Sequence, residues 1–307
     1  MGSLLSPHSP QTQSIESLFL LVLTIAAVVF LVVAAGVVWA IVRYRWRGGD
    51  GEPHQRFGSR TVEITWTVVP LLIVTGLFIM TVRAMVFIDA PQNSSRQPDL
   101  VVTGHQWWWE ARYPNGAETA ADIHIPASRR LLVRIESADV VHDFWAPELA
   151  RKMDAVPGRS SYIWLEAAEP GTYLGTCSEF CGADHAWMRF RLIAEPEHAF
   201  EAWLTRQAQP PPQVTGLAAQ GEQLFHSKKC ADCHATGGVG APLTKGPSLA
   251  HLVDRQQLGG GIAQNTPENL ALWLTSPQAA KPGNRMPGTS LTAGEAQALL
   301  AYLEALR

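Results

Sequence analysis

The chain has 307 residues, more than the roughly 100–200 of a usual single domain, and its composition changes along its length, so we expect several modules. Its net charge of −3 conceals an acidic middle, since residues 90–206 carry 11 basic and 16 acidic side chains and the regions on either side are each at +1. Such a surface argues against nucleic acid as a partner. It suits a basic protein partner, or it is ordinary solubilising charge.

Two apolar runs predict a membrane hairpin. Residues 18–42 hold no charge, and a second charge-free run at 64–82 continues past Arg83 to residue 88. A helix of either length spans a hydrocarbon core of roughly 30 Å. A cleaved signal peptide is the alternative for the first run, but its apolar core is only about 7–15 residues long and follows positive charge, whereas residues 1–17 contain no Lys or Arg.

The charges between the two runs predict the orientation in the membrane. Short loops rich in Arg stay in the cytoplasm, and this loop carries five: Arg43, Arg45, Arg47, Arg56 and Arg60. We therefore expect two spans in a bacterial inner (cell) membrane, at about 18–42 and 64–88. Residues 1–17 and 90–307 would then lie on the periplasmic or outer side.

The region from 90 to 206 is predicted to be a β-sandwich or barrel. Its β-rich runs are short and are bounded by Gly, Pro or Asp: residues 100–109, 131–137, 161–167, 171–176 and 188–194. Residues 207–216 contain three consecutive prolines and predict an extended linker.

Residues 217–307 are predicted to form a small all-α domain. Helices are expected at 217–225, at 268–274 after Pro267, and at 293–303 with Thr292 as the N-cap. The last of these has apolar residues spaced three and four apart. The predicted modules are thus an N-terminal segment at 1–17, a hairpin at 18–89, a β-rich domain at 90–206, a linker at 207–216 and an all-α domain at 217–307.

Cys177 and Cys181 stand four residues apart, with His185 four residues later and Met188 three beyond that. Soft sulfur and imidazole ligands together favour copper over hard cations, and His142 is a candidate second imidazole. A disulfide, a zinc site and a mononuclear copper site are the alternatives. Zinc would not need Met188, and a mononuclear copper site would leave one thiol idle.

The other two Cys residues form a Cys-x-x-Cys-His motif, Cys230 to His234, which is typical of covalent haem c attachment. The two thiols would form thioether bonds, His234 would bind iron, and Met286 is the candidate distal ligand. A thioredoxin-like redox motif is the alternative, but it requires a βαβ context that the helical pattern here does not offer.

The segment Cys177–Met188, read as Cys-x-Glu-x-Cys-Gly-x-x-His-x-x-Met, resembles the copper A loop of cytochrome c oxidase subunit II. The resemblance extends in order and spacing over residues 18–195, through the segments 61–70, 104–109 and 154–159. Residues 217–307 resemble a class I cytochrome c. The whole chain therefore resembles subunit II of a caa-type haem-copper oxidase, with the fold of a two-helix transmembrane hairpin, a cupredoxin-like β-sandwich and an all-α cytochrome c domain.

This resemblance implies a ligand set. Cys177 and Cys181 would bridge two copper ions, with His142 and His185 as terminal ligands. Met188 and the backbone carbonyl of Glu179 would complete the two coordination spheres weakly.

The resemblance also implies roles outside the copper ligands. Trp107 matches the electron-entry tryptophan, and Trp108 stands beside it where the family commonly has Tyr. The carboxylate of Glu179 would help to hold magnesium at the boundary with the catalytic subunit. Glu63 matches a carboxylate near a proton-uptake entrance, or it is an acid that interacts with a helix N-terminus.

The implied function is electron transfer in a proton-pumping oxidase. An external donor such as a cytochrome c would reduce haem c, and electrons would pass to binuclear copper and then to the haem of subunit I, which reduces oxygen to water. No residue of this chain would be catalytic. The expected partners are subunit I, subunit III and membrane lipid; the alternatives are the copper A subunit of a nitric oxide reductase and a copper-storage protein, although storage has no use for haem.

Overall fold

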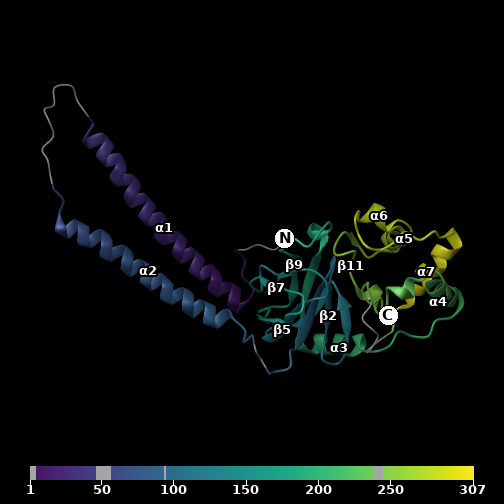
Figure 1. Ribbon diagram of the computed structural model, residues 1–307. Coiled ribbons are helices and arrows are strands. Elements are labelled where there is room, and N and C mark those ends of the chain that lie inside the picture. Colours follow the sequence, from purple (N-terminus) through teal and green to yellow (C-terminus); the bar gives the residue numbers. More distant parts are fainter. Residues whose placement is uncertain (1–4, 46–56, 93–94, 238–244) are drawn as a thin grey trace. The chain divides into compact units, whose positions relative to one another are not determined.

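The computed structural model describes residues 5–45, 57–92, 95–237 and 245–307. The chain divides into two compact units, of which one contains Gln13–Asp89 and the other contains Met1–Thr12 together with Ala90–Arg307 (Figure 1). Each unit is described by itself below.

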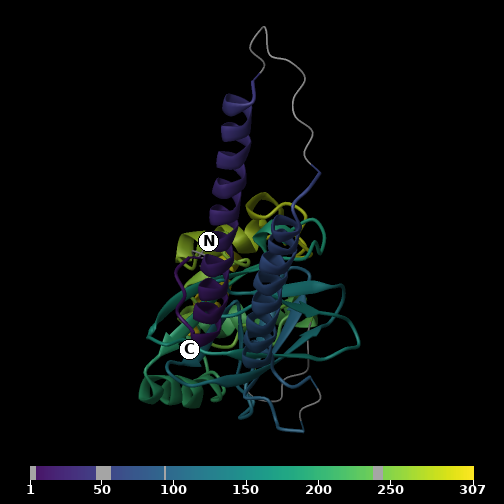
Figure 2. The same ribbon diagram turned by 90° about the vertical axis from the view of Figure 1, so that its left-hand side faces the viewer.

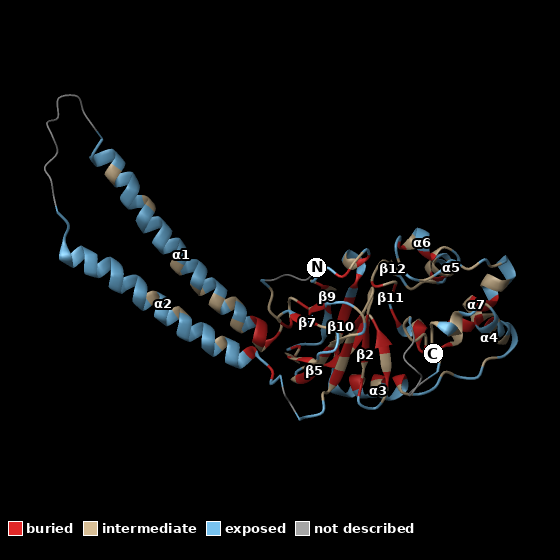
Figure 3. Ribbon diagram, in the orientation of Figure 1, coloured by how far each residue is buried: buried red, intermediate tan, exposed pale blue. Residues whose placement is uncertain are grey.

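The smaller unit consists of two long apolar helices. Helix α1 spans Pro10–Arg43 and α2 spans Arg60–Ile88, and the chain runs along them in opposite directions (Figure 2). Both are long and apolar enough to cross a membrane, and the predicted spans 18–42 and 64–88 lie within them. Their side chains are exposed along nearly the whole length (Figure 3), so this surface suits hydrocarbon rather than a protein core. Of the five loop arginines, Arg47 and Arg56 lie outside the described residues.

The residues before the first span belong to the larger unit. The Ser9 hydroxyl donates to the Leu149 carbonyl at 2.7 Å, and the Thr12 hydroxyl donates to the Glu148 carbonyl at 2.9 Å. Ser9 is fully buried. Part of the predicted N-terminal segment 1–17 is therefore packed on the folded β domain.

The β domain is a sandwich of two five-stranded sheets, with strand orders β3-β2-β1-β5-β8 and β4-β10-β9-β6-β7. The pairs β1–β5 and β4–β10 are parallel, and the other pairs are antiparallel. The strands are β1 Leu100–His105, β2 Trp108–Arg112, β3 Glu118–Ala120, β4 Asp122–Pro126, β5 Leu131–Ser137, β6 His142–Trp145, β7 Met153–Ala155, β8 Ser161–Leu165, β9 Gly171–Cys177 and β10 Arg189–Glu195.

The sandwich core follows from strand periodicity. In β1 and β8 buried and half-buried side chains alternate, because successive residues of a strand point to opposite faces. Trp109, Phe144 and Phe190 are fully buried and contact one another at ring-centroid distances of 4.3–5.8 Å. Helix α3, Glu197–Gln207, adds Phe200 and Trp203 to this core.

The β-sandwich prediction is confirmed, with two differences in the strands. The predicted strand 100–109 is broken at Gln106 and Trp107, where the chain turns back so that β2 pairs with β1. Strands β3, β4, β6 and β7 were not predicted, because runs of three to five residues give too few alternations to be recognised.

The C-terminal region is helical, as predicted. Its elements are α4 Gly216–Ser227, α5 Pro267–Thr275, α6 Pro277–Ala280 and α7 Ala293–Ala305, with short 3-10 helices η2 Cys230–Asp232 and η3 Leu252–Asp254 and the two-residue strands β11 Gln257–Leu258 and β12 Ala263–Gln264. Thr292 caps α7, and it exchanges hydrogen bonds with Glu295 in a capping box. Helices α4 and α7 pack through Phe225, Leu299 and Tyr302.

Candidate metal centre and haem-attachment site

Strand pairing brings the predicted copper ligands to one end of the sandwich. Strand β6 begins with His142, and it pairs with β9, whose last residue is Cys177. The Cys177 N–H donates to the Met188 carbonyl at 3.0 Å, which closes the β9–β10 connection at its base. We call residues 177–188 the copper loop; within it His185 lies in the 3-10 helix η1, His185–Trp187.

The side-chain atoms of the loop converge. The Cys177 and Cys181 sulfurs are 3.8 Å apart, the His142 Nδ1 lies 3.9 Å from the Cys177 sulfur, and the His185 Nδ1 lies 3.6 Å from the Cys181 sulfur. The Met188 sulfur is 3.8 Å from that of Cys181. The Glu179 carbonyl is 3.2 Å from the Cys177 sulfur. The structure therefore brings together all six predicted donors.

Both thiols are free, and their separation is far beyond the roughly 2.05 Å of a disulfide bond. A hydrogen bond from Cys181 is the main reason that the pKa of Cys177 is lowered, to about 3, although burial opposes it. The same bond raises the pKa of Cys181. The thiolate is the form of cysteine that binds metal, so the lowered pKa of Cys177 suits a metal ligand.

His142 is held in one orientation by Asp139. Its ring is completely buried, and its Nε2 lies 2.7 Å from the Asp139 carboxylate. Because a carboxylate only accepts, Nε2 carries the proton and Nδ1 is left to face the sulfurs. Burial pushes the pKa of Asp139 up, but hydrogen bonds from His142 and from the Val140 and Gln106 N–H groups outweigh it and hold that pKa below its ordinary value.

The donor set fits copper. Two thiols, two imidazoles, a thioether and a carbonyl offer the soft ligands that copper prefers, and four of the side chains, His142, Cys177, Cys181 and Met188, are buried. The ligand atoms of His142, Cys177 and Cys181 all lie within 4.8 Å of one another. The zinc alternative does not explain why Met188 points its sulfur at Cys181.

The three consecutive tryptophans have three different environments. The Trp107 Nε1–H donates to the Cys181 carbonyl at 3.1 Å, beside a second bond to that carbonyl from the Gln106 amide. Trp108 stacks on His105, with ring centroids 4.2 Å apart. Trp109 is in the core. Of the two candidates for electron entry, Trp107 is the one that touches the copper loop.

Two other predicted positions lie at the surface. The Glu179 side chain is exposed, although its carbonyl faces the sulfurs. Glu63 lies in the first turn of α2, in the helical unit, and is also exposed.

The haem-attachment motif has the geometry that its chemistry needs. Cys230 begins η2, and the His234 N–H donates to its carbonyl at 3.0 Å, so the motif is one tight turn. The His234 Nδ1 lies 2.8 Å from the Pro247 carbonyl and must donate to it, which leaves Nε2 as the free ligand atom. Burial lowers the pKa of His234 and so favours the neutral, ligating imidazole.

The surroundings also suit a bound haem. Arg255 is buried, its Nε has no hydrogen-bond partner among the described residues, and burial lowers its pKa to about 10. Its terminal NH₂ donates to the Ser248 and Ala250 carbonyls, so one buried N–H of this cation is left for an anionic group. Met286, the candidate distal ligand, has its N–H fixed by the Asn284 side chain at 2.8 Å and its carbonyl bound by Gln278.

Sequence reasoning did not identify Gln106, Asp184, Lys281 and Arg285 as site residues. Gln106 reaches the Cys181 carbonyl only because the chain turns between β1 and β2, and the others matter through contacts between the β domain and the C-terminal domain. No local pattern carries such information.

Comparison with known proteins covers almost the whole chain. Family models match at residues 4–83 (cytochrome c oxidase subunit II, transmembrane domain), 116–194 (cytochrome c oxidase subunit II, periplasmic domain) and 218–307 (cytochrome c). A cytochrome c oxidase subunit 2 of Alkalihalophilus pseudofirmus is 37% identical, over 99% of this chain and 90% of the relative. The same subunit of Bacillus sp. strain PS3 is 34% identical, over 86% and 80%.

One solved structure is the periplasmic domain of subunit II of cytochrome oxidase (CoxB) of Bradyrhizobium japonicum, which is 32% identical and covers 37% of this chain and 96% of that one, with a TM-score of 0.35. The matched domains imply copper A and haem c as cofactors and a catalytic oxidase subunit as partner. With its two apolar helices the chain is anchored in a membrane. It belongs to the cytochrome c oxidase subunit II family and is the subunit II of a haem-copper oxidase, with a cupredoxin-like sandwich and a fused C-terminal cytochrome c domain.

Proposed function

We propose that this chain is the electron-entry subunit of a proton-pumping oxidase that reduces oxygen to water. When bound, the two cofactors supply one-electron carriers: haem c takes electrons from an external donor such as a cytochrome c, and binuclear copper A delivers them to the haem of subunit I. The observation that carries this proposal is the convergence of six donor atoms, three of them sulfur, in a chain that also holds a Cys-x-x-Cys-His turn.

In this proposal Cys177 and Cys181 would supply the thiolates that hold the two copper ions, and His142 and His185 would supply one imidazole each through Nδ1. Met188 and the Glu179 carbonyl are the weak ligands. The residues come from two paired strands, β6 and β9, and from a loop closed at its base, so their positions should change little with oxidation state and little reorganisation would be needed for fast transfer.

At the haem, Cys230 and Cys233 form the covalent tethers, His234 binds iron through Nε2, and Met286 supplies the distal sulfur. The Pro247 carbonyl orients His234, as Asp139 orients His142. The fused domain lies on the same side of the membrane as the copper domain, which we propose to be the periplasmic or outer side because haem c attachment occurs there.

Further roles are proposed at the surface. The exposed carboxylate of Glu179 is placed to bind magnesium at the boundary with subunit I, and Glu63 lies near a proton-uptake entrance. Trp107, with Trp108 beside it, is the entry point for electrons into copper. Subunit III completes the complex.

Oxygen chemistry is tested by measuring oxygen and nitric oxide consumption of the purified membrane complex with reduced cytochrome c or an artificial donor. We expect oxygen uptake. Nitric oxide consumption without oxygen uptake would overturn the proposal and identify a nitric oxide reductase instead.

The copper assignment has its own test. The complex should show the spectrum of a delocalised mixed-valence copper pair, and Cys177→Ser should abolish it. The neighbouring Ser178→Ala removes only a hydroxyl that donates to Asp143, so it serves as the matched control and should keep the signal. A mononuclear copper signal in the unmodified complex would refute the binuclear site.

A further inference from the structure

Lys281 of the cytochrome domain is buried against the copper domain. Its ammonium donates to the Trp107 carbonyl at 3.3 Å and to the Gly259 carbonyl at 2.9 Å, and it lies 3.8 Å from the Asp184 carboxylate. Lys281 is only 4% exposed and Asp184 only 1%. A lysine is almost never this buried unless it is paired, so the charge has a specific place here.

Arg285, four residues later, contacts the same region of the copper domain. Its guanidinium lies 5.7 Å from the centre of the Trp107 ring, and it donates to the Gln106 side chain. Arg285 immediately precedes Met286. The residue next to the candidate haem ligand therefore touches the tryptophan whose indole N–H binds the Cys181 carbonyl.

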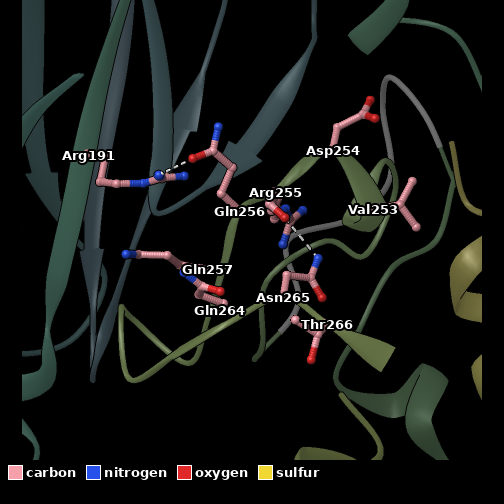
Figure 4. Close-up of a pocket in the computed structure, with 9 residues that line it drawn as sticks. All are labelled: Arg191, Val253, Asp254, Arg255, Gln256, Gln257, Gln264, Asn265 and Thr266. Carbon is pink, nitrogen blue, oxygen red and sulfur yellow. Dashed lines mark hydrogen bonds between the residues drawn. The ribbon is translucent and has the colours of Figure 1, made fainter. Parts of the chain in front are cut away.

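A second contact fixes the same two domains along β10. Arg191 binds Asp122 through two hydrogen bonds and also donates to the Gln256 side chain at 2.5 Å, while the Gln256 N–H donates to Asp122 at 2.9 Å. Figure 4 shows Arg191 directed at Gln256.

Close backbone packing completes this contact. The Arg189 N–H donates to the Gly260 carbonyl at 3.2 Å. A Cβ on Gly260 would lie 2.4 Å from the Trp187 carbonyl, and its φ of +79° favours glycine, so the two backbones meet where a side chain would not fit.

We propose that Lys281 and Arg285 are positioning residues that hold the Met286 segment on Trp107 and the copper loop, so that the fused cytochrome stays seated during turnover. This inference rests on the proposed function of the two domains. The proposal implies that an external donor protein delivers its electrons to haem c and not directly to Trp107, because this chain's own cytochrome domain covers Trp107.

The seated arrangement is tested first without any electron transfer. The whole complex is treated with an amine-reactive reagent, and labelling of Lys281 is compared by mass spectrometry with that of the exposed Lys245 of the same domain. We expect Lys281 to react more than about tenfold more slowly than Lys245, because the contact between the cytochrome domain and the copper domain must open first. After denaturation the two lysines should react equally fast. Similar rates in the native complex would overturn the proposal.

The second test measures the rate of electron transfer from haem c to copper in the complex. Lys281→Met and Arg285→Gln should each slow it severalfold, because the contacts that hold the Met286 segment against Trp107 are lost and electron tunnelling falls steeply with distance. Arg285→Lys, which keeps the charge over Trp107, should restore most of the rate, and Lys245→Met should leave it unchanged. The spectra of both cofactors should be the same in all four variants.

Ionic strength separates a seated domain from one that docks transiently. Buried charges are screened little by salt, so the wild-type rate of electron transfer from haem c to copper should stay constant as salt is raised. The rate at which the complex oxidises an external cytochrome c should change with salt, because that protein docks through exposed charges. A haem-to-copper rate that falls steeply with salt, or unchanged rates in both Lys281→Met and Arg285→Gln, would refute the positioning role. In either case oxygen uptake and the copper spectrum would remain, so the proposed function would stand.

Discussion

Asp139→Asn should weaken copper binding without changing the fold. Asp139 lies outside the copper loop and is not a predicted copper ligand. One of its carboxylate oxygens receives the His142 Nε2–H at 2.7 Å, and the other receives the Gln106 N–H at 2.7 Å. Asparagine has the same shape and only one acceptor oxygen. One of these two N–H groups must therefore face an NH₂ group, and the negative charge that orients His142 is lost.

The magnitude follows from the hydrogen bond. A bond to a charged group contributes about 1.5–3 kcal/mol, and 1.4 kcal/mol corresponds to a factor of ten, so copper affinity should fall by roughly 10- to 150-fold. This agrees with the 10- to 100-fold that partners of metal-binding histidines typically contribute.

The assay is competition with a copper chelator on the purified complex, followed through the copper spectrum. Glu169→Gln, the same chemical change at an exposed position, is the control and should bind copper as the wild type does. Affinity within threefold of wild type in Asp139→Asn would show that the His142 orientation is set by packing alone, which would refute the reasoning.

Three further predictions concern other parts of the chain. In Gly175→Ala the new Cβ would lie 2.1 Å from the Phe190 ring, so the sandwich should lose about 1–3 kcal/mol of stability in thermal unfolding followed by tryptophan fluorescence, whereas Gly171→Ala on the same strand makes only ordinary contacts and should cost far less. Thr292→Ala removes the cap of α7 and should destabilise the cytochrome domain by about 1 kcal/mol, seen as faster amide hydrogen exchange in that helix; unchanged exchange would contradict it. Trp107→Phe keeps the ring but removes the bond to the Cys181 carbonyl, worth about 1 kcal/mol, and should slow copper reduction by haem c in stopped-flow experiments while the copper spectrum persists.

Much of the site could be predicted because its information is local. Five of the six copper donors fall within residues 177–188, and a helix cap such as Thr292 needs only the next three residues. The apolar spans are equally local. In each case residue type and spacing fix the chemistry before any tertiary structure forms.

The rest depends on contacts between distant residues. The apolar run 100–109 looks like one strand, yet a turn at Gln106 and Trp107 is what carries both side chains to the Cys181 carbonyl. Asp139 stands three residues before His142, and only the folded structure shows that its carboxylate receives the Nε2–H of that ring. Lys281 is 174 residues from the carbonyl that it binds, a distance over which a single sequence offers no pattern.

The copper loop has two sides with different surroundings. One side, at Cys181 to Asp184, is contacted by the cytochrome domain. Lys281 pairs with Asp184, and Gly283 lies so near Ala183 that a Cβ added to the glycine would be 3.3 Å from the Ala183 Cβ. The other side presents Phe180, which is 77% exposed, next to the exposed carboxylate of Glu179. Aromatic side chains are enriched in the cores of protein interfaces, and Phe180 is a large exposed one, so we expect the catalytic subunit to bind there. Electrons would then enter the loop from the covered side and leave from the exposed one, so the two sides of the loop would define the route of the relay.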